Sequence, residues 1–377
     1  MKSRDIQYKT ILIIFVALFL LFLCGDFKIP TVSETAVITA VGVGKSENGE
    51  FELTFLLAGT NENGERENKV VSTSAPTVAG GVEMLKSGYG LTPKLAFMGL
   101  VLVEEELANG EIFDVISFFL NTSGVHDSAK LMIASGKVSK IFTADVKSEK
   151  SGLGGLSKVL ATAEKKPIAV PQINLKDFAE TYFSNGVDAV LAGVNIEKIG
   201  EQTVFDISEG YLYHGDEIKD KINGDTVVAY NILKGKGKGG SFTVEDVALE
   251  NCTSDMRLSV ASVSCKVDKK LELGVPKINV DVKMKVGLLD QNTSSKTLSQ
   301  IAGMGADKEI ISNAVEDFIK ENIKTLLEKS FKSNADFLGI GEELMVKNKD
   351  FEVADGYLGN AFAGVEVAVE VLQNYRL

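Results

Sequence analysis

One apolar segment near the amino terminus decides where the rest of this chain must fold. Basic residues precede thirteen consecutive apolar residues, 11–23, and this run ends at Cys24. A basic start, a short apolar stretch and a cysteine directly after it are typical of an export signal that ends at a lipidation site. We therefore expect residues 1–24 to be a lipoprotein signal peptide, and the body that follows to fold on the outer surface of a membrane.

The length of the apolar run favours a signal over a membrane span. Thirteen helical residues rise about 20 Å, whereas the hydrocarbon core of a bilayer is about 30 Å thick. The thiol of Cys24 can carry a diacylglycerol, and two or more acyl chains are needed for a stable anchor. Leu23 stands where lipoprotein signals usually carry a small residue. An ordinary signal peptide and an uncleaved short anchor are therefore the alternatives to lipidation.

Charge excludes two kinds of partner. The whole chain has a net charge of −12, and residues 1–24 hold three positive charges and one negative, so the remaining body is at −14. Binding to nucleic acid requires a basic face, and so does adhesion to anionic lipid headgroups. We expect neither, so membrane attachment depends on Cys24. About 350 residues follow the signal, enough for two or three domains with apolar cores.

Two further cysteines are Cys252 and Cys265, with twelve residues between them, on what read as neighbouring strand segments. In an exported protein they could form a disulfide, or they could be two small buried thiols, and the sequence leaves both possibilities open. No histidine lies near them, so they do not predict a zinc site.

Periodic patterns predict the elements of the body. Alternating apolar residues at 36–44 and 51–57, separated by a turn, predict a β-hairpin. A wide apolar stripe at helical spacing predicts a long helix at 308–332. The other predicted helices are 75–87, 112–120, 153–163 and 175–183, and the other predicted strands are 95–103, 130–134, 187–196, 209–212, 244–252, 257–267, 277–286 and 365–371. Antiparallel strands followed by a long helix and a last strand favour the α+β class.

A glycine-rich stretch at 235–240 contains two Gly-Lys pairs. Neither pair is followed by Ser or Thr, and the flanking residues are strand-like, so the stretch does not fit a phosphate-binding loop. We expect a flexible, mildly basic connection between domains.

The residues that could support catalysis do not form a recognisable pattern. His126 and His214 are the only histidines, and each lies at the edge of a loop, where an exposed turn residue is the simpler interpretation. The three glutamates 104–106 begin a helix, where they suit its dipole. Motifs of zinc proteases, calcium loops and nucleophile elbows are absent. Other carboxylates are scattered rather than spaced as ligands, among them Asp188, Asp206 and Asp216. We expect no catalytic residue, cofactor or metal.

Several stretches, in order along the chain, resemble the Ger(x)C family, the C subunits of bacterial spore germinant receptors. KLAFMGLVLVEEELA, followed by IFDVISFFL, is similar to the N-terminal part of that family. DAVLAGVNI and GYLYHGDEIKDKINGD resemble a strand and a hairpin of its middle part. SNADFLGIGEEL, which contains Asp336, Gly339 and Gly341, and the final VEVAVEV resemble its end.

This resemblance implies a non-enzymatic, elongated protein of three mixed α/β domains, each a β-sheet packed with helices. Together with the predicted elements it divides the body into an N-terminal α/β domain at 25–145, a middle domain at 146–240 with a helical section and a strand hairpin, and a C-terminal domain at 241–377 with antiparallel strands and the long helix. The family implies assembly with a multi-spanning A subunit and a transporter-like B subunit, on the outer face of the spore inner membrane. We expect the partner subunits to dock on the solvent-exposed faces of the sheets and on the loops 61–69 and 234–241.

A different class shares the anchor, the length and the acidity: an extracytoplasmic solute-binding lipoprotein of a transporter. Such proteins have two lobes of repeated strand-helix-strand units around a cleft. The second half of this chain instead predicts antiparallel strands and one long helix, so we keep this class as the alternative function.

Overall fold

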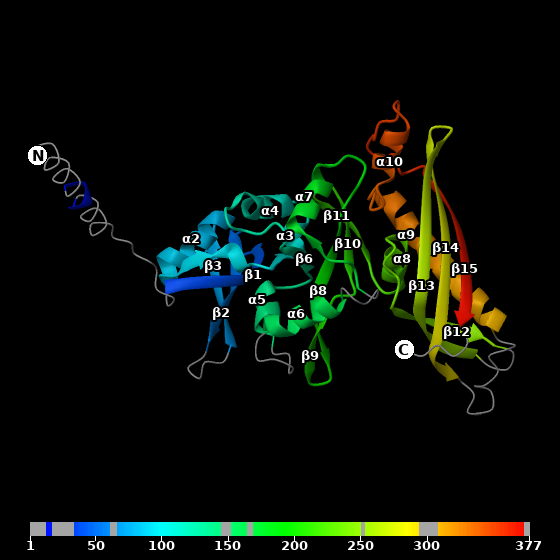
Figure 1. The fold of residues 1–377 in the computed structure, drawn as a ribbon, viewed down its shortest axis with the longest axis horizontal. Helices are drawn as coiled ribbons and strands as arrows, with labels where there is room; N and C mark the ends of the chain where they lie inside the picture. Colours follow the sequence, from blue (N-terminus) through cyan, green and yellow to red (C-terminus); the bar gives the residue numbers. More distant parts are fainter. Residues whose placement is uncertain are drawn as a thin grey trace, which may run out of the picture.

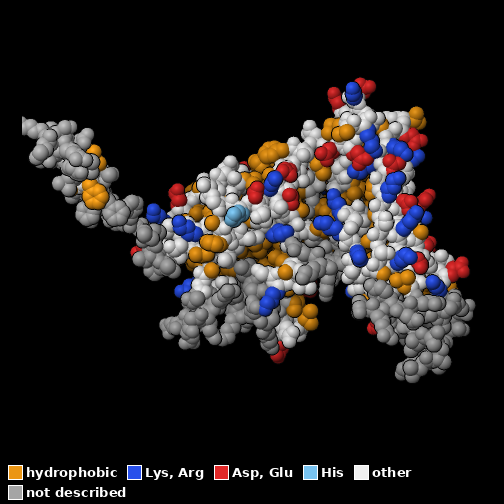
Figure 2. All heavy atoms as spheres, viewed as in Figure 1, with side chains coloured by type: hydrophobic (Ala, Val, Ile, Leu, Met, Phe, Trp, Pro, Cys, Tyr) orange, Lys and Arg blue, Asp and Glu red, His pale blue; other side chains and the backbone are white. Residues whose placement is uncertain are grey.

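The computed structural model of the chain describes residues 13–16, 34–60, 66–144, 152–163, 169–249, 253–293 and 308–372. From residue 34 on, these ranges form an elongated body that contains a larger and a smaller sheet, with helices packed against both (Figure 1). Acidic and basic side chains are interspersed over the surface of the smaller-sheet half (Figure 2). Within them, no helix combines the length and the apolar character needed to cross a membrane. The predicted lipidation site Cys24 lies outside the described residues.

The larger sheet has eleven strands, and its main path runs in the order β11-β10-β8-β6-β5-β1-β2-β3. Its central strands β1, β5, β6 and β8 are parallel to one another and lie among apolar side chains on both faces. This agrees with their apolar sequences, because parallel strands are usually covered on both sides. The strands are β1 (Thr35–Lys45), β2 (Phe51–Thr60), β3 (Arg66–Ala75), β4 (Thr92–Lys94), β5 (Leu100–Glu104), β6 (Lys130–Ala134), β7 (Ile173–Asn174), β8 (Val190–Ile199), β9 (Gln202–Asp206), β10 (Gly210–His214) and β11 (Glu217–Ile222).

Helices cover both faces of the larger sheet. One face packs against α2 (Val78–Tyr89), α4 (Ile112–Asn121) and α7 (Leu175–Phe183), with the short α3 (Glu105–Ala108) beside them. The other face packs against α5 (Val138–Thr143) and α6 (Gly152–Ala163). Side-chain caps fix two of the helix starts, because Thr77 accepts a hydrogen bond from Gly80 N–H at 3.1 Å and Asn174 accepts one from Asp177 N–H at 2.7 Å.

Most predicted elements of this sheet are confirmed, including the hairpin, in which Lys45 pairs with Phe51. Two predictions are wrong in part. The stretch 61–69 was expected to be a loop, but strand β3 already begins at Arg66. The apolar run 95–103 begins as a 3₁₀ turn, η2 (Leu95–Phe97), and the strand starts only at Leu100. Phe97 is 68% exposed, so this part of the run does not enter the core. An apolar run alone does not reveal where a strand begins.

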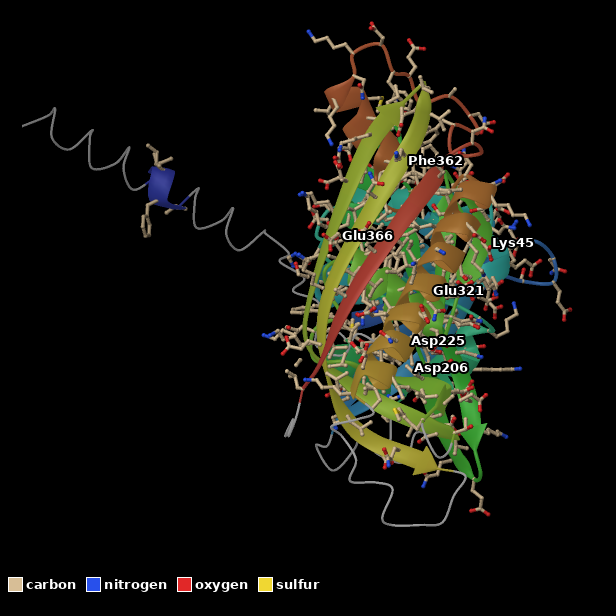
Figure 3. The ribbon with its side chains drawn as sticks, turned by 90° about the vertical axis from the view of Figure 1, so that its right-hand side faces the viewer. Lys45, Asp206, Asp225, Glu321, Phe362 and Glu366 are labelled. Carbon is tan, nitrogen blue, oxygen red and sulfur yellow. The ribbon has the colours of Figure 1, made fainter. Side chains whose placement is uncertain are left out.

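The smaller sheet has the order β12-β13-β14-β15, with β12 (Ser241–Ala248), β13 (Thr253–Glu272), β14 (Val275–Thr293) and β15 (Phe362–Leu372). The first three strands are antiparallel, as predicted, and β15 joins β14 in parallel. The predicted long helix is confirmed as α9 (Lys308–Ser333), whose apolar stripe is buried against one face of the sheet. Figure 3 shows α9 beside β15 and Glu366 on the strand in front of it. Two shorter helices, α8 (Asp225–Leu233) and α10 (Ile340–Lys347), lie at the margins of the smaller sheet.

The sheets do not follow the predicted domains one for one. Strand β8 comes from the segment 146–240, yet it pairs in parallel with β6 of the segment 25–145. The described residues therefore hold two sheets rather than three, because β8 completes the edge that β6 would otherwise leave open. The elongated α+β class is confirmed, and the division into three domains stays a prediction. One apolar core continues from the α5–α6 face of the larger sheet through α8 into the smaller sheet.

Of the two cysteines whose pairing the sequence left open, Cys252 lies outside the described residues. Cys265 lies within β13, which is continuous from Thr253 to Glu272. Cys265 is a free, half-buried thiol, and burial raises its pKa to about 11.

Candidate functional site at the junction of the two sheets

The two sheets are fastened by residues 334–341, which comprise the loop after α9 and the first two residues of α10. Asp188, just before β8 of the larger sheet, donates its backbone N–H to the Asp336 carbonyl at 2.7 Å. In return, the backbone N–H of Asp336 donates to Asp188 Oδ2 at 2.8 Å. This reciprocal pair joins residues 148 positions apart in the chain. It is stronger than a neutral pair because the Asp188 acceptor is a carboxylate.

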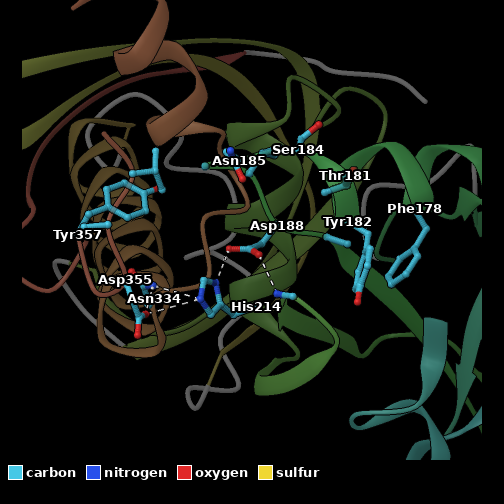
Figure 4. Close-up of a pocket in the computed structure, with 16 residues that line it drawn as sticks. Phe178, Thr181, Tyr182, Ser184, Asn185, Asp188, His214, Asn334, Asp355 and Tyr357 are labelled. Carbon is cyan, nitrogen blue, oxygen red and sulfur yellow. Dashed lines mark hydrogen bonds and ion pairs between the residues drawn. The ribbon is translucent and has the colours of Figure 1, made fainter. Parts of the chain in front are cut away.

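His214 completes the contact from the turn between β10 and β11. Its Nδ1 lies 3.1 Å from Asp188 Oδ2, and its Nε2 lies 3.3 Å from Asn334 Nδ2 (Figure 4). Since an amide nitrogen only donates, this arrangement assigns the proton of a neutral imidazole to Nδ1. Asp188 Oδ1 accepts the backbone N–H of Gly215 at 3.2 Å. The predicted turn at His214 is confirmed, and the sequence missed that this side chain links the two halves.

Asp336 is fully buried beneath this contact. Its Oδ2 accepts the backbone N–H of Gly341 at 2.8 Å and the hydroxyl of Tyr357. Its Oδ1 has no hydrogen-bond partner among the described residues. Burial raises the pKa of Asp336, and burial together with the neighbouring Asp336 raises the pKa of Tyr357 well above its ordinary value. The site thus holds a carboxyl group whose ionisation is opposed by its surroundings.

Two lysines bind the carbonyl groups of the same loop, and one of them, Lys269, is buried. Lys234, at the end of α8, donates to the Phe337 carbonyl at 2.8 Å, and desolvation of its ammonium group lowers its pKa. Lys269 of β13 donates to the carbonyls of Leu338 at 2.7 Å and Gly339 at 3.2 Å. The Phe337 ring, which is buried, packs against Tyr230 of α8 with 5.5 Å between ring centroids. The loop is therefore held from β8, α8 and β13 at once.

Two glycines allow the backbones to approach closely at this point. A Cβ on Gly341 would lie 2.7 Å from Gly186 Cα and 2.8 Å from the Tyr357 hydroxyl. Gly186 has φ +78°, and a Cβ there would lie 2.6 Å from the backbone nitrogen of Glu342. That nitrogen donates to the Gly186 carbonyl at 3.1 Å. Neither position accommodates a side chain without displacement of backbone.

A hollow of about 300 Å³ opens beside this contact. Figure 4 shows Phe178 and Tyr182 of α7 on one side, Asp188 and His214 at the centre, and Asn334, Asp355 and Tyr357 on the other side. The residues of its walls come from both halves of the chain. The described residues contain no cluster of three or more His, Cys, Asp or Glu side chains that could hold a metal ion.

The other residues that the sequence singled out lie elsewhere. His126 is exposed before β6 and takes no part in the junction. Glu104 is buried and accepts hydrogen bonds from Val138 N–H at 3.0 Å and Lys137 Nζ at 2.9 Å, which raises the pKa of Lys137. It therefore fixes the start of α5, whereas the other two glutamates of the run occupy the first turn of α3 as predicted. Residues 235–240 connect α8 to β12, and because both elements pack in the half of the smaller sheet, the expected position of this stretch between two domains stays a prediction.

Sequence reasoning found only part of this site. Asp336, Gly339 and Gly341 were marked by their family-like stretch, and the structure places them at the junction. Asp188 was read as a scattered carboxylate, because its partner is remote in sequence. Asp206 and Asp216 are not among the residues that line the hollow.

Comparisons with known proteins agree with the geometry. The family model described as "Spore germination protein N-terminal domain" matches residues 30–196, and the model "Spore germination B3/ GerAC like, C-terminal" matches residues 209–374. No curated protein matches the chain. A solved structure described as "Crystal Structure of the GerBC protein" is similar in fold, with a TM-score of 0.53 and 12% identity, over 88% of this chain and 97% of that one. The second family model begins inside the larger sheet, since β10 starts at Gly210.

Proposed function

Because the chain belongs to the spore germination GerAC family, we propose that it is the lipid-anchored C subunit of a germinant receptor and acts without catalysis. The observation that carries this proposal is the match of both family domains, in order, over nearly the whole chain after the predicted signal. In this role the subunit assembles with integral A and B subunits on the outer face of the spore inner membrane and is required for nutrient-triggered germination.

The geometry supports a structural role for the body. Reciprocal hydrogen bonds and a continuous apolar core hold the two sheets together, and Lys234 and Lys269 fix the loop that makes the contact. A body of this kind transmits a displacement at one end to the other end, because packed cores shift as units. Strand β1 begins at Thr35, eleven residues after Cys24, so an acylated Cys24 lies at most about 40 Å from the larger sheet. The anchor thus keeps the body close to the membrane and to integral partners.

The alternative of a solute-binding lipoprotein has less support. That class is built from two doubly wound lobes, whereas the smaller sheet here has three antiparallel strands and is covered by the long helix α9. Family membership favours the receptor subunit.

A test of the proposal replaces Cys24 and compares it with a matched cysteine. Cys24→Ala should move the chain from the membrane fraction of spores to the soluble fraction and reduce nutrient germination to the level of a strain without the chain. Cys265→Ala removes a thiol of the body and should change neither property. The proposal is contradicted if the Cys24→Ala chain stays in the membrane fraction while germination remains normal.

A further inference from the structure

We propose that the hollow between the two halves is a binding site for a small organic cation with a short apolar side chain, of the primary ammonium class. This inference concerns the isolated chain, and it does not depend on the receptor assembly proposed above.

The size of the hollow limits the ligand. Ligand pockets usually measure about 300–1,000 Å³, and this hollow, at about 300 Å³, is at the lower end. It accommodates a metabolite-sized molecule rather than a peptide. Its walls come from α7 and the segment between α7 and β8, and from the turn between β10 and β11. The residue after α9 and the loop after α10 complete them. A bound molecule therefore touches elements of both sheets at once.

The charge of the walls selects the sign of the ligand. The sixteen residues that line the hollow include two carboxylates, Asp188 and Asp355, and no Lys or Arg. Asp188 is the preorganised one, since its side chain is only 12% exposed and is fixed by three donors. Among the described residues, its Oδ1 accepts the Gly215 N–H alone, and a carboxylate oxygen accepts two hydrogen bonds. One acceptor position is thus available for an ammonium group, whereas the two carboxylates of the lining repel an anion.

The opposite wall selects an apolar body. The half-buried Tyr182 of α7 presents its ring to the hollow, and the fully buried Phe178 packs beside it with 6.3 Å between the ring centroids. Val187 and Ala354 add further apolar surface. Aromatic faces attract cations as well as alkyl groups, so an ammonium with a short alkyl chain satisfies both walls. Figure 4 shows these rings on the far side of Asp188 from Asp355.

Three probes with the same carbon skeleton test the charge requirement: 3-methylbutylamine, 3-methylbutan-1-ol and 3-methylbutanoate, which are cationic, neutral and anionic at pH 7. Each is measured by saturation-transfer NMR with the full chain in detergent micelles, and micelles without protein give the baseline. We expect binding of the amine, at least fivefold weaker binding of the alcohol and none of the carboxylate. Equal signals from all three probes would overturn the proposal.

Two variants test the location. Ala354→Phe fills the hollow from its exposed rim and should abolish amine binding, whereas Ala161→Phe, on the exposed face of α6, should leave it unchanged. Asp355→Asn should weaken binding about two- to fivefold, the effect expected for an exposed ion pair, because the Asp355 side chain is 96% exposed. Asp188 is kept intact because it also fastens the junction. Full amine binding by the Ala354→Phe chain would place the ligand elsewhere and refute the assignment.

Discussion

The Asp188 side chain offers the sharpest test of the junction. In the Asp188→Ala chain three donors lose their acceptor: Asp336 N–H, Gly215 N–H and His214 Nδ1–H. Gly215 is solvent-accessible and the His214 side chain is 38% exposed, so both recover hydrogen bonds to water. Asp336 is fully buried, and its N–H does not. The penalty therefore comes mainly from one buried donor.

The magnitude follows from that count. An unsatisfied buried donor costs about 1–3 kcal/mol, and hydrogen bonds to a charged group are at the upper end of the usual range. We expect Asp188→Ala to lower the free energy of unfolding by about 2–4 kcal/mol. Asp355→Ala removes a carboxylate from the same rim that is 96% exposed, and should change that free energy by no more than about 0.5 kcal/mol.

Urea denaturation of the full chain in detergent, followed by circular dichroism and by tyrosine fluorescence, measures both variants, since the chain has no tryptophan. Hydrogen exchange adds a local readout: the amides of residues 334–341 should lose protection in the Asp188→Ala chain, whereas those of β5 should not. A loss below 1 kcal/mol, or one equal to that of Asp355→Ala, would refute the assignment of Asp188 as the fastening residue.

Three further predictions address the same region and the buried thiol. Gly341→Ala places a Cβ 2.7 Å from backbone and should cost about 1–3 kcal/mol in calorimetry, whereas Gly99→Ala, which meets nothing within 4 Å, should be neutral; equal costs would contradict the close approach. Because the pKa of Asp336 is raised in the folded chain, the protonated carboxyl group stabilises the fold at low pH. This contribution to the free energy of unfolding is lost as the pH rises from about 4 through the raised pKa. The free energy of unfolding, measured against pH, should therefore fall for the parent chain across that window but not for the Asp336→Asn chain. If the two chains show the same pH dependence, burial of Asp336 does not oppose its ionisation. With its pKa raised to about 11, Cys265 should react slowly with thiol reagents at pH 8 until the chain unfolds, and fast labelling of the folded chain would show an open site.

Periodicity predicted those elements whose burial is regular. The long helix α9 and the hairpin of β1 and β2 match the sequence closely, because one continuous apolar stripe or alternation fixes each of them. The apolar pattern predicted that β13 ends at residue 267 and β14 at residue 286, but the strands continue to Glu272 and Thr293. Beyond Val267 and Val286 these strands continue with mixed polar residues, where pairing between the strands, rather than an apolar pattern, maintains the extended backbone.

Relations between remote residues were the part that sequence could not provide. Strand β8 pairs with the edge of the sheet that β6 would otherwise leave open, and the sequence of neither strand specifies this partner. The bond from Asp336 to Asp188 spans 148 positions, so each residue looks ordinary in its own segment. The family resemblance marked stretches on both sides of the junction, 188–196, 210–225 and 333–344, but it did not show that they meet.

The central claim is that this chain works as a subunit beside integral membrane partners. Affinity capture of an epitope-tagged chain from solubilised spore inner membranes, followed by mass spectrometry, tests it most directly. The account predicts recovery of a multi-spanning A-type subunit and a transporter-like B-type subunit together with the chain, under conditions that recover neither with an unrelated tagged spore lipoprotein. Capture of the intact, membrane-bound chain without either subunit, also after mild cross-linking, would contradict it.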